Sequence, residues 1–209
     1  YNQEFYDCLL KVLAMKARWQ VRKLRSSVLD KQDAATNPGV IIFIDEPYLV
    51  SAGTSFFNIS SSEITRMLDE IIEAVHREGA YAGIHCCGNT DWPIILKSRV
   101  DILNFDSYDY QETLFLYPEE LNGFAARGGV LAWGAVPAYG FGCRESQTIA
   151  LPAYSDKDVL DIDTLLNKME RQKNICLVTP SCGLSGVSPE KADKILEMTV
   201  KIAARLPQR

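Results

Sequence analysis

Stretches patterned like buried β-strands alternate with stretches patterned like amphipathic helices along most of this chain of 209 residues. Strand-like runs occur at 40–44, 81–84, 102–105, 130–133 and 175–178. The run at 40–44 is continuously β-branched or aromatic, which is typical of a strand buried on both faces of a parallel sheet. The alternation therefore predicts an α/β fold built of βαβ units with right-handed crossovers.

Apolar residues at helical spacing and capping residues indicate the helices between these strands. The first helix is expected at 6–24, and a second follows the capping-box candidate at 60–63 and ends at Gly79. Further helices are expected at 92–96, 118–126, 162–169 and from 189 to about 204. A segment at 137–158 with scattered Gly and Pro interrupts the alternation, and we expect an insert loop there that acts as a lid or binding loop.

Two architectures produce this alternation, an open doubly wound sheet and a (β/α)8 barrel. A whole barrel typically needs about 250 residues. The chain opens with a helix and lacks an initial Met, so we expect earlier units upstream. Our first choice is a TIM barrel, of which residues 1–209 form the C-terminal part of one catalytic domain with roughly the last five βα units. In either architecture ligands bind at the carboxyl ends of the strands.

The composition narrows the classes of partner and location. The chain is 47% hydrophobic and 23% charged, as in ordinary globular proteins. Its 22 basic and 27 acidic residues give a net charge of −5, so we expect no nucleic-acid partner. No apolar run approaches the roughly 20 residues that span a bilayer, and no leader pattern opens the chain, so we expect no membrane association. The six scattered cysteines favour a reduced, cytoplasmic protein.

Metal-ligating residue types gather at the predicted strand ends. Side chains alternate along an extended segment, so His85 and Cys87 should point to one side and Cys86 to the other. Cys182 follows the last strand and could approach them if the sheet curls or closes. Asp106, at the end of the third strand, could supply an oxygen. An imidazole, two thiolates and a carboxylate or substrate form a tetrahedral set that suits Zn²⁺.

Other residues at the same edge are candidate binding residues. Asp45 and Glu46 end the first strand before a proline, where they could act on a substrate or simply cap a turn. Trp133 ends the fourth strand. Tyr108 follows Asp106 in a segment that is either an acidic and aromatic wall or an exposed loop. We expect Cys8, Cys86 and Cys176 to pack in the core. We expect no functional role for His76. Cys143, in the insert, has either a redox role or none.

These motifs resemble the second half of the catalytic barrel of cobalamin-independent methionine synthase. Its superfamily also holds uroporphyrinogen decarboxylase and the methylcobalamin:coenzyme M methyltransferases. The similarity runs from the first strand to the final helix, and the His-x-Cys with a distant Cys-Gly-Leu is its most specific part. The segments that carry it are Ile44-Asp45-Glu46-Pro47, His85-Cys86-Cys87-Gly88-Asn89, residues 102–107 and Thr179-Pro180-Ser181-Cys182-Gly183-Leu184.

The resemblance implies a zinc-dependent methyltransferase that methylates a thiol, as in methionine biosynthesis. It implies that the metal ligands are His85, Cys87, Asp106 and Cys182. The synthases usually have Glu at the position of Asp106. The resemblance also implies that Asp45, with Glu46, contacts the amino end of a small thiol substrate. We further expect Trp133 to wall the pocket or the carrier. The methyl donor would be a methylated folate or a corrinoid protein, and a homo-oligomer is allowed.

Two other interpretations explain the same residues. In the first, the ligands form a structural zinc site of a binding module, with a fourth protein ligand and no exchangeable position. In the second, the chain is a relative of the metal-free uroporphyrinogen decarboxylases, and its cysteines pack in the core. The His-x-Cys and Cys-Gly-Leu motifs argue against the second, because that branch lacks the metal ligands.

Overall fold

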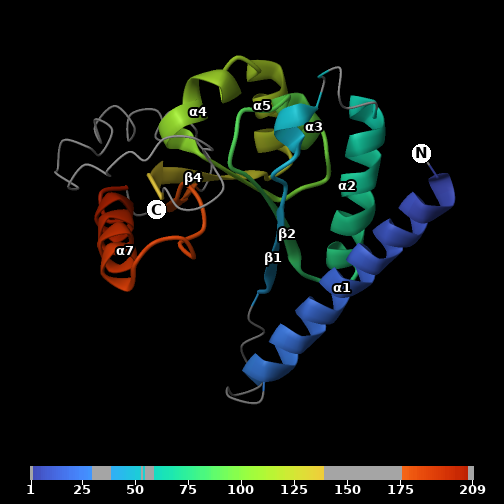
Figure 1. Ribbon diagram of the computed structural model, residues 1–209, viewed down its shortest axis with the longest axis horizontal. Helices are drawn as coiled ribbons and strands as arrows, with labels where there is room; N and C mark the ends of the chain where they lie inside the picture. Colours follow the sequence, from blue (N-terminus) through green and yellow to red (C-terminus); the bar gives the residue numbers. More distant parts are fainter. Residues whose placement is uncertain (1, 30–38, 53, 55–58, 139–175, 207–209) are drawn as a thin grey trace.

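Five parallel strands form a sheet whose strand order follows the order of the chain (Figure 1). The strands are β1 (Ile41–Asp45), β2 (Tyr81–Cys86), β3 (Ile102–Phe105), β4 (Val130–Val136) and β5 (Cys176–Pro180). The computed structural model describes residues 2–29, 39–52, 54, 59–138 and 176–206. Each predicted strand is present, with its ends moved by a few residues at most.

Helices surround this sheet in the order that the alternation predicts. They are α1 (Gln3–Leu29), the short 3-10 helix η1 (Leu49–Ser51), α2 (Ser61–His76), α3 (Trp92–Leu96), α4 (Ser107–Leu114), α5 (Pro118–Ala126) and α7 (Pro189–Ala203). The helix α4 was not predicted, because its sequence has little apolar periodicity. The predicted helix at 162–169, the insert beyond residue 138 and Cys143 lie outside the described residues.

The sequential strand order favours a barrel-type arrangement over an open doubly wound sheet. Right-handed crossovers between successive neighbours place the helices on one face, and α2, α3, α5 and α4 form an arc over that face (Figure 1). A doubly wound sheet reverses its order at a switch point, and the five described strands show no reversal. The α/β prediction is confirmed. Closure into a barrel stays a prediction, since β1 and β5 are the edges of the described sheet.

The two faces of the sheet differ in their side chains. On the helix-covered face, Phe105 and Trp133 are register partners and are fully buried. Alternation sends His85 and its register partner Asn104 to the opposite face. That face is less covered, and Phe43 of β1 is half-exposed there, with its ring lying across Gly83 of β2. His85 therefore lies on the face opposite the arc of α2, α3, α5 and α4.

Capping residues start and stop the helices as the sequence indicates. The Ser60 hydroxyl accepts a hydrogen bond of 3.2 Å from the backbone N–H of Glu63, which starts α2. Gly79 adopts a φ of +68° after α2, a conformation that favours glycine. Ser188 accepts from the backbone N–H of Lys191 at 3.4 Å and caps α7 in the same way.

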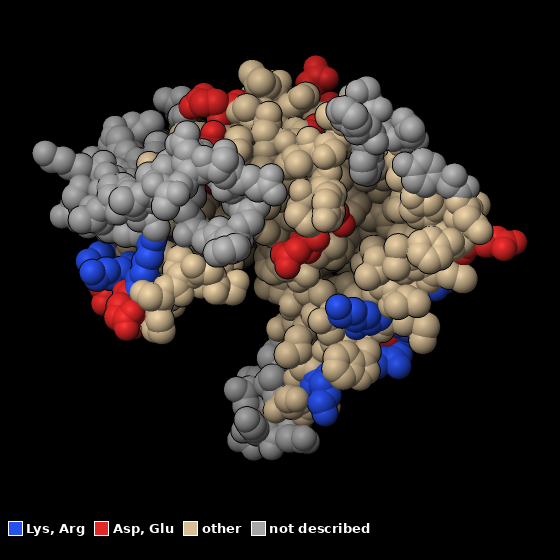
Figure 2. Space-filling view, in the orientation of Figure 1, with Lys and Arg blue, Asp and Glu red and all other residues tan. Residues whose placement is uncertain are grey.

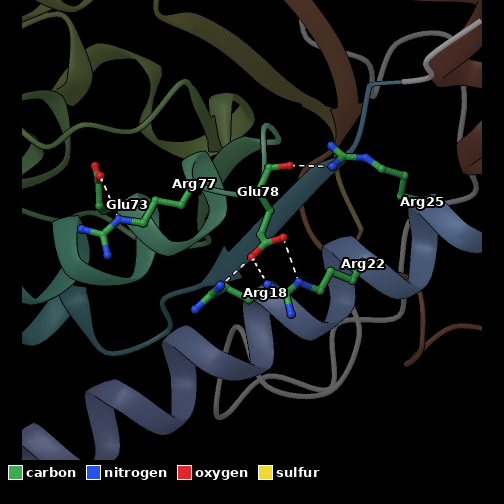
Figure 3. Close-up of polar contacts among 6 residues, drawn as sticks. All are labelled: Arg18, Arg22, Arg25, Glu73, Arg77 and Glu78. Atoms are coloured by element: carbon green, nitrogen blue, oxygen red, sulfur yellow. Dashed lines mark hydrogen bonds and ion pairs between the residues drawn. The ribbon is translucent and has the colours of Figure 1, made fainter.

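The helix α1 is held against α2 by a group of arginines. Arg18 and Arg22 donate to the Glu78 carboxylate at 2.7–2.9 Å, and Arg25 donates to the carbonyls of Glu78 and Gly79 at 2.7 and 3.1 Å (Figure 3). The hydrogen bonds from Arg22 and Arg18 lower the pKa of Glu78 to about 2. We call these contacts the arginine clamp. They fix the position of α1 beside the sheet.

Two minor predictions are wrong. Cys8 does not pack in the core: it is exposed, because α1 buries only a narrow stripe that includes Leu10, Ala17 and Val21. His76 has a structural contact, since its Nε2 lies 2.7 Å from a carboxylate oxygen of Asp101 and so joins α2 to the start of β3. No helix among the described residues is long and apolar enough to cross a membrane.

Candidate metal centre

One imidazole and two thiols meet at the carboxyl end of the sheet. The ligand atoms of His85, Cys87 and Cys182 all lie within 4.8 Å of one another. Each of the three residues is half-buried, so the group is neither sealed in the core nor fully in solvent. The prediction that these three residues come together is confirmed.

The strand β2 supplies two of the three ligands. His85 lies within β2, and Cys87 follows its last residue. Between them Cys86 points into the core, where it is fully buried and donates a 3.4 Å hydrogen bond to the carbonyl of Gly88. Burial raises the pKa of the Cys86 thiol to about 11, which keeps it protonated. The alternation of side chains along the strand therefore places His85 and Cys87 on one side and Cys86 on the other, as predicted.

Cys182 reaches the group through the turn that follows β5. Its neighbour Ser181 is buried, and the Ser181 N–H donates to the carbonyl of Val136 at 2.8 Å. The Ser181 hydroxyl accepts from the N–H of Ala138 at 3.0 Å. A Cβ at Gly134 would lie 2.6 Å from the Phe105 carbonyl oxygen and 2.8 Å from the Ser181 Cα. Glycine at 134 thus lets this turn cross the end of β4.

Asn104 orients the imidazole, and sequence reasoning missed it. Its Nδ2 donates to the carbonyl of Ala132 at 2.9 Å and contacts the Thr179 hydroxyl at 2.8 Å. This orientation leaves Oδ1 as the acceptor for Nδ1–H of His85, at 2.5 Å. The proton of a neutral imidazole then sits on Nδ1, and Nε2 keeps a lone pair for a metal. The sequence signal for this role was an Asn inside the apolar run 102–105, because a buried polar side chain needs hydrogen-bond partners.

The unsatisfied atom of His85 matches this assignment. Its Nε2 is buried and has no hydrogen-bond partner among the described residues. Burial lowers the pKa of His85, but contacts with Cys182 and Asn104 and the charges of Cys182 and Asp45 raise it, and the net pKa lies above its ordinary value. A buried nitrogen without a partner beside two sulfurs is the arrangement that a cation would complete.

The donor set fits zinc. With bonds of about 2.0–2.3 Å, the ligand atoms of a tetrahedral zinc site lie about 3.5–3.8 Å apart. The three ligand atoms lie within 4.8 Å of one another, so they are at most about 1.3 Å farther apart than in a formed site. Imidazole and thiolate ligands suit zinc and other soft or borderline cations, and exclude Mg²⁺ and Ca²⁺ as natural occupants.

The acidic candidates lie around this group without joining it. Asp45 is exposed and is the register partner of His85. The pKa of Glu46 is raised by burial and by the charge of Asp45, and the backbone N–H of Glu46 donates to the His85 carbonyl at 2.9 Å. The Asp106 carboxylate accepts from the backbone N–H groups of Tyr108 and Asp109 at 3.0 and 3.1 Å, so it caps α4. Its role as a fourth ligand stays a prediction, because it is outside the group within 4.8 Å.

The aromatic candidates occupy other places than expected. Trp133 is fully buried on the helix-covered face, between Phe105 and Phe115 at ring-centroid distances of 5.4 and 5.9 Å. It cannot wall a pocket at His85, which lies on the other face, and that prediction is corrected. Strand alternation explains the error: Ala132, not Trp133, lies in register with Asn104. Tyr108 is in the first turn of α4 and is half-buried, so its segment is not an exposed loop.

Comparison of the sequence with known proteins does not identify a family or a function. The chain matches no protein-family model and no curated protein. A five-stranded parallel sheet with a His, Cys, Cys group at its carboxyl end is what the residues establish. The function is therefore inferred from the chemistry of that group.

Proposed function

We propose that this chain is the catalytic part of a zinc-dependent methyltransferase that methylates a small thiol. The observation that carries the proposal is the convergence of His85, Cys87 and Cys182 within 4.8 Å, with a buried imidazole nitrogen that finds no hydrogen-bond partner in the described part of the chain. The resemblance of the flanking motifs to cobalamin-independent methionine synthase supports the same reaction class.

Three protein ligands favour a catalytic over a structural zinc site. Structural sites are usually closed by four protein ligands, whereas catalytic sites keep one position for water or substrate. Among the described residues the group contains three ligands, and Asp106 is engaged in capping α4. A zinc ion held there would keep a bound thiol deprotonated near neutral pH, where a free thiol with a pKa of about 8.5 is mostly protonated.

The residues of the chain would then hold the substrate and orient the ligands. Asn104 keeps the His85 proton on Nδ1, and the turn around Ser181 holds Cys182 in reach. Asp45, on the same face as His85, would bind the cationic end of an amino-thiol. In the reaction the substrate sulfur forms a bond to the methyl carbon, and the bond to the carrier breaks with its electron pair staying on the carrier. The donor would be a methylated folate or a corrinoid protein.

The curvature of the sheet supports a barrel as the wider architecture. Strands β2 and β5 are separated by β3 and β4, which in a flat sheet places them about 14 Å apart. Ligand atoms from these two strand ends nevertheless lie within 4.8 Å. We propose that the sheet is an arc of a (β/α)8 barrel whose carboxyl end carries the site.

Zinc-edge X-ray absorption with and without a thiol tests the function. The purified chain should hold zinc, and adding homocysteine should add one sulfur to the first coordination shell and lose one light-atom ligand. Methyl transfer from a methylated folate or methylcobalamin should then be measured on the same sample. An unchanged coordination shell, or less than about 0.2 zinc per chain, would defeat the proposal.

A matched pair of variants separates the site from the fold. Cys182→Ala should lose both zinc and methyl transfer. Cys86→Ala should keep both, because Cys86 is buried in the core and points away from the group. Asp45→Asn should raise KM for an amino-thiol while leaving zinc content and KM for an uncharged thiol unchanged.

A further inference from the structure

The helix α1 has two apolar stripes on opposite sides. The inner stripe is buried against the rest of the protein, and its members are Leu10, Ala14, Ala17 and Val21. The outer stripe lies about 180° around the helix, at 100° per residue, and we call it the outer seam. The outer seam consists of Phe5, Cys8, Val12, Met15 and Trp19. Four of these side chains are 61–68% exposed, and Cys8 is exposed as well.

The spacing of the outer seam is that of a coiled coil. Its members follow one another at intervals of three, four, three and four residues. This is the a and d pattern of a heptad, in which each side chain fits between four residues of a facing helix. An interfacial membrane helix instead needs a broad apolar face opposite a polar one. On α1 the side opposite the outer seam is apolar and already packed.

The outer seam is also held in a fixed position. The arginine clamp ties the second half of α1 to the end of α2 (Figure 3). In the first half of α1 the Lys11 ammonium donates to the Glu70 carboxylate at 2.5 Å. A partner therefore meets a formed helix and does not have to order it, which lowers the cost of binding. Exposed apolar side chains arranged in this way mark an interaction surface.

The charges beside the outer seam select the partner. The e positions beside the outer seam hold Lys16 and Lys23. The g positions on the other side hold Lys11 and Arg18, whose charges are already paired with Glu70 and Glu78. In Figure 2 blue side chains stand beside uncharged ones along the lower half of α1. An antiparallel second copy would place the Lys16 and Lys23 flanks of the two copies against each other. Like charges disfavour this pairing, whereas an acidic helix is complementary to the flank.

We propose that the outer seam binds an amphipathic α-helix of a partner protein, one whose apolar stripe is flanked by Glu or Asp. The partner helix packs its apolar side chains against Val12, Met15 and Trp19, and its carboxylates lie along the flank that holds Lys16 and Lys23. The binding surface is separate from the metal centre and does not depend on the proposed reaction.

A designed peptide tests the proposal on the full chain. The probe is a synthetic helix of about four heptads with Leu at a and d and Glu at e and g, and the control peptide has Lys at e and g. Trp19 is the reporter: Trp92 and Trp133 are fully buried, whereas Trp19 is 63% exposed, so binding should shift its emission to shorter wavelength. The acidic peptide should bind and the basic one should not.

Paired variants locate the binding surface. The double variant Val12→Gln, Met15→Gln should weaken binding at least about tenfold. The matched variant Leu13→Gln, Leu24→Gln changes exposed apolar residues of α1 outside the outer seam and should change binding less than about twofold. Gln has a helix propensity close to that of Leu and Met, so α1 should stay folded, and circular dichroism checks this.

Five outcomes would overturn the proposal. The acidic peptide does not bind, or the basic peptide binds equally well. The matched variant loses as much affinity as the seam variant. Sedimentation of the chain alone shows a dimer that the seam variant abolishes, which assigns the surface to a second copy. Vesicles containing phosphatidylserine shift the Trp19 emission while the peptide does not, which assigns it to a membrane surface.

Discussion

Removing the Asn104 side chain is the sharpest test of how the metal centre is built. In Asn104→Ala the Nδ1–H of His85 loses its acceptor, so the ring can rotate and can hold its proton on Nε2. Both changes oppose metal binding, because the ligand nitrogen needs a lone pair in a fixed direction. We expect zinc affinity to fall although none of the three proposed ligands is altered.

The size of the effect follows from two separate losses. Loss of a group that orients a ligating His typically lowers metal affinity about 10- to 100-fold, or about 1.4–2.8 kcal/mol. The same substitution leaves the buried carbonyl of Ala132 without its side-chain donor, which costs about 1–3 kcal/mol of folding free energy. Asn104→Asp should separate the two, because its carboxylate still accepts from His85 but cannot donate to Ala132.

Competition with a chromophoric chelator measures zinc affinity, and thermal unfolding of the metal-free chain measures stability. Asn104→Ala should lose both, and Asn104→Asp should lose stability with affinity within about threefold of the wild type. Thr199→Val is the control, because it removes a buried hydroxyl from α7 that bonds the Ile195 carbonyl at 2.8 Å. If Asn104→Ala bound zinc as tightly as the wild type, the proposed path from Ala132 through Asn104 to His85 would be refuted.

Three further variants probe other parts of the structure. Cys182→Ala should fall below about 0.2 zinc per chain by elemental analysis, whereas Cys86→Ala should keep its zinc and lose about 1 kcal/mol of stability; equal zinc loss in both would contradict the site. Gly134→Ala should weaken zinc binding in a chelator competition, because its Cβ meets the backbone of Ser181 at 2.8 Å, and unchanged affinity would show that the turn carrying Cys182 adapts. Glu78→Gln should lower the melting temperature at pH 7. A Glu with a lowered pKa stabilises the fold above pH 4.5 and loses this effect as the pH falls toward 2. The difference in melting temperature between the variant and the wild type should therefore shrink between pH 4.5 and pH 2. A difference in melting temperature that does not depend on pH would contradict the arginine clamp.

The strands and most helices could be predicted because their signals are local. A continuous β-branched run such as 40–44 has few alternatives to a buried strand. The capping Ser60 and the stop at Gly79 bound α2 without reference to the rest of the chain. The helix α4 was not predicted because its sequence has little apolar periodicity, and its capping residue Asp106 was interpreted as a metal ligand instead. A carboxylate at a strand end can serve either purpose, and the sequence alone does not reveal the cap.

At the site, alternation predicted which cysteine of the pair is a ligand, but it was not applied to the aromatic candidate. The same period of two that sends Cys87 to His85 and Cys86 to the core also sends Trp133 to the core, since Trp133 is in register with Phe105. Asn104 was missed because its role requires knowing its register partner across the sheet. Residues that act through neighbouring strands are therefore the ones that a single sequence hides.

The approach of Cys182 to His85 shows how these local rules combine into a site. Three strand spacings separate β2 from β5, about 14 Å in a flat sheet, which is more than two side chains can bridge. The turn after β5 contributes to the approach, because Ser181 lies directly over Gly134 of β4, where a larger residue would meet the Phe105 carbonyl and the Ser181 backbone. The arrangement of His85, Cys87 and Cys182 thus depends on a residue without a side chain as well as on the three residues themselves. A chain with the same His and Cys positions but a bulkier residue at 134 should fold into the same sheet and bind zinc poorly.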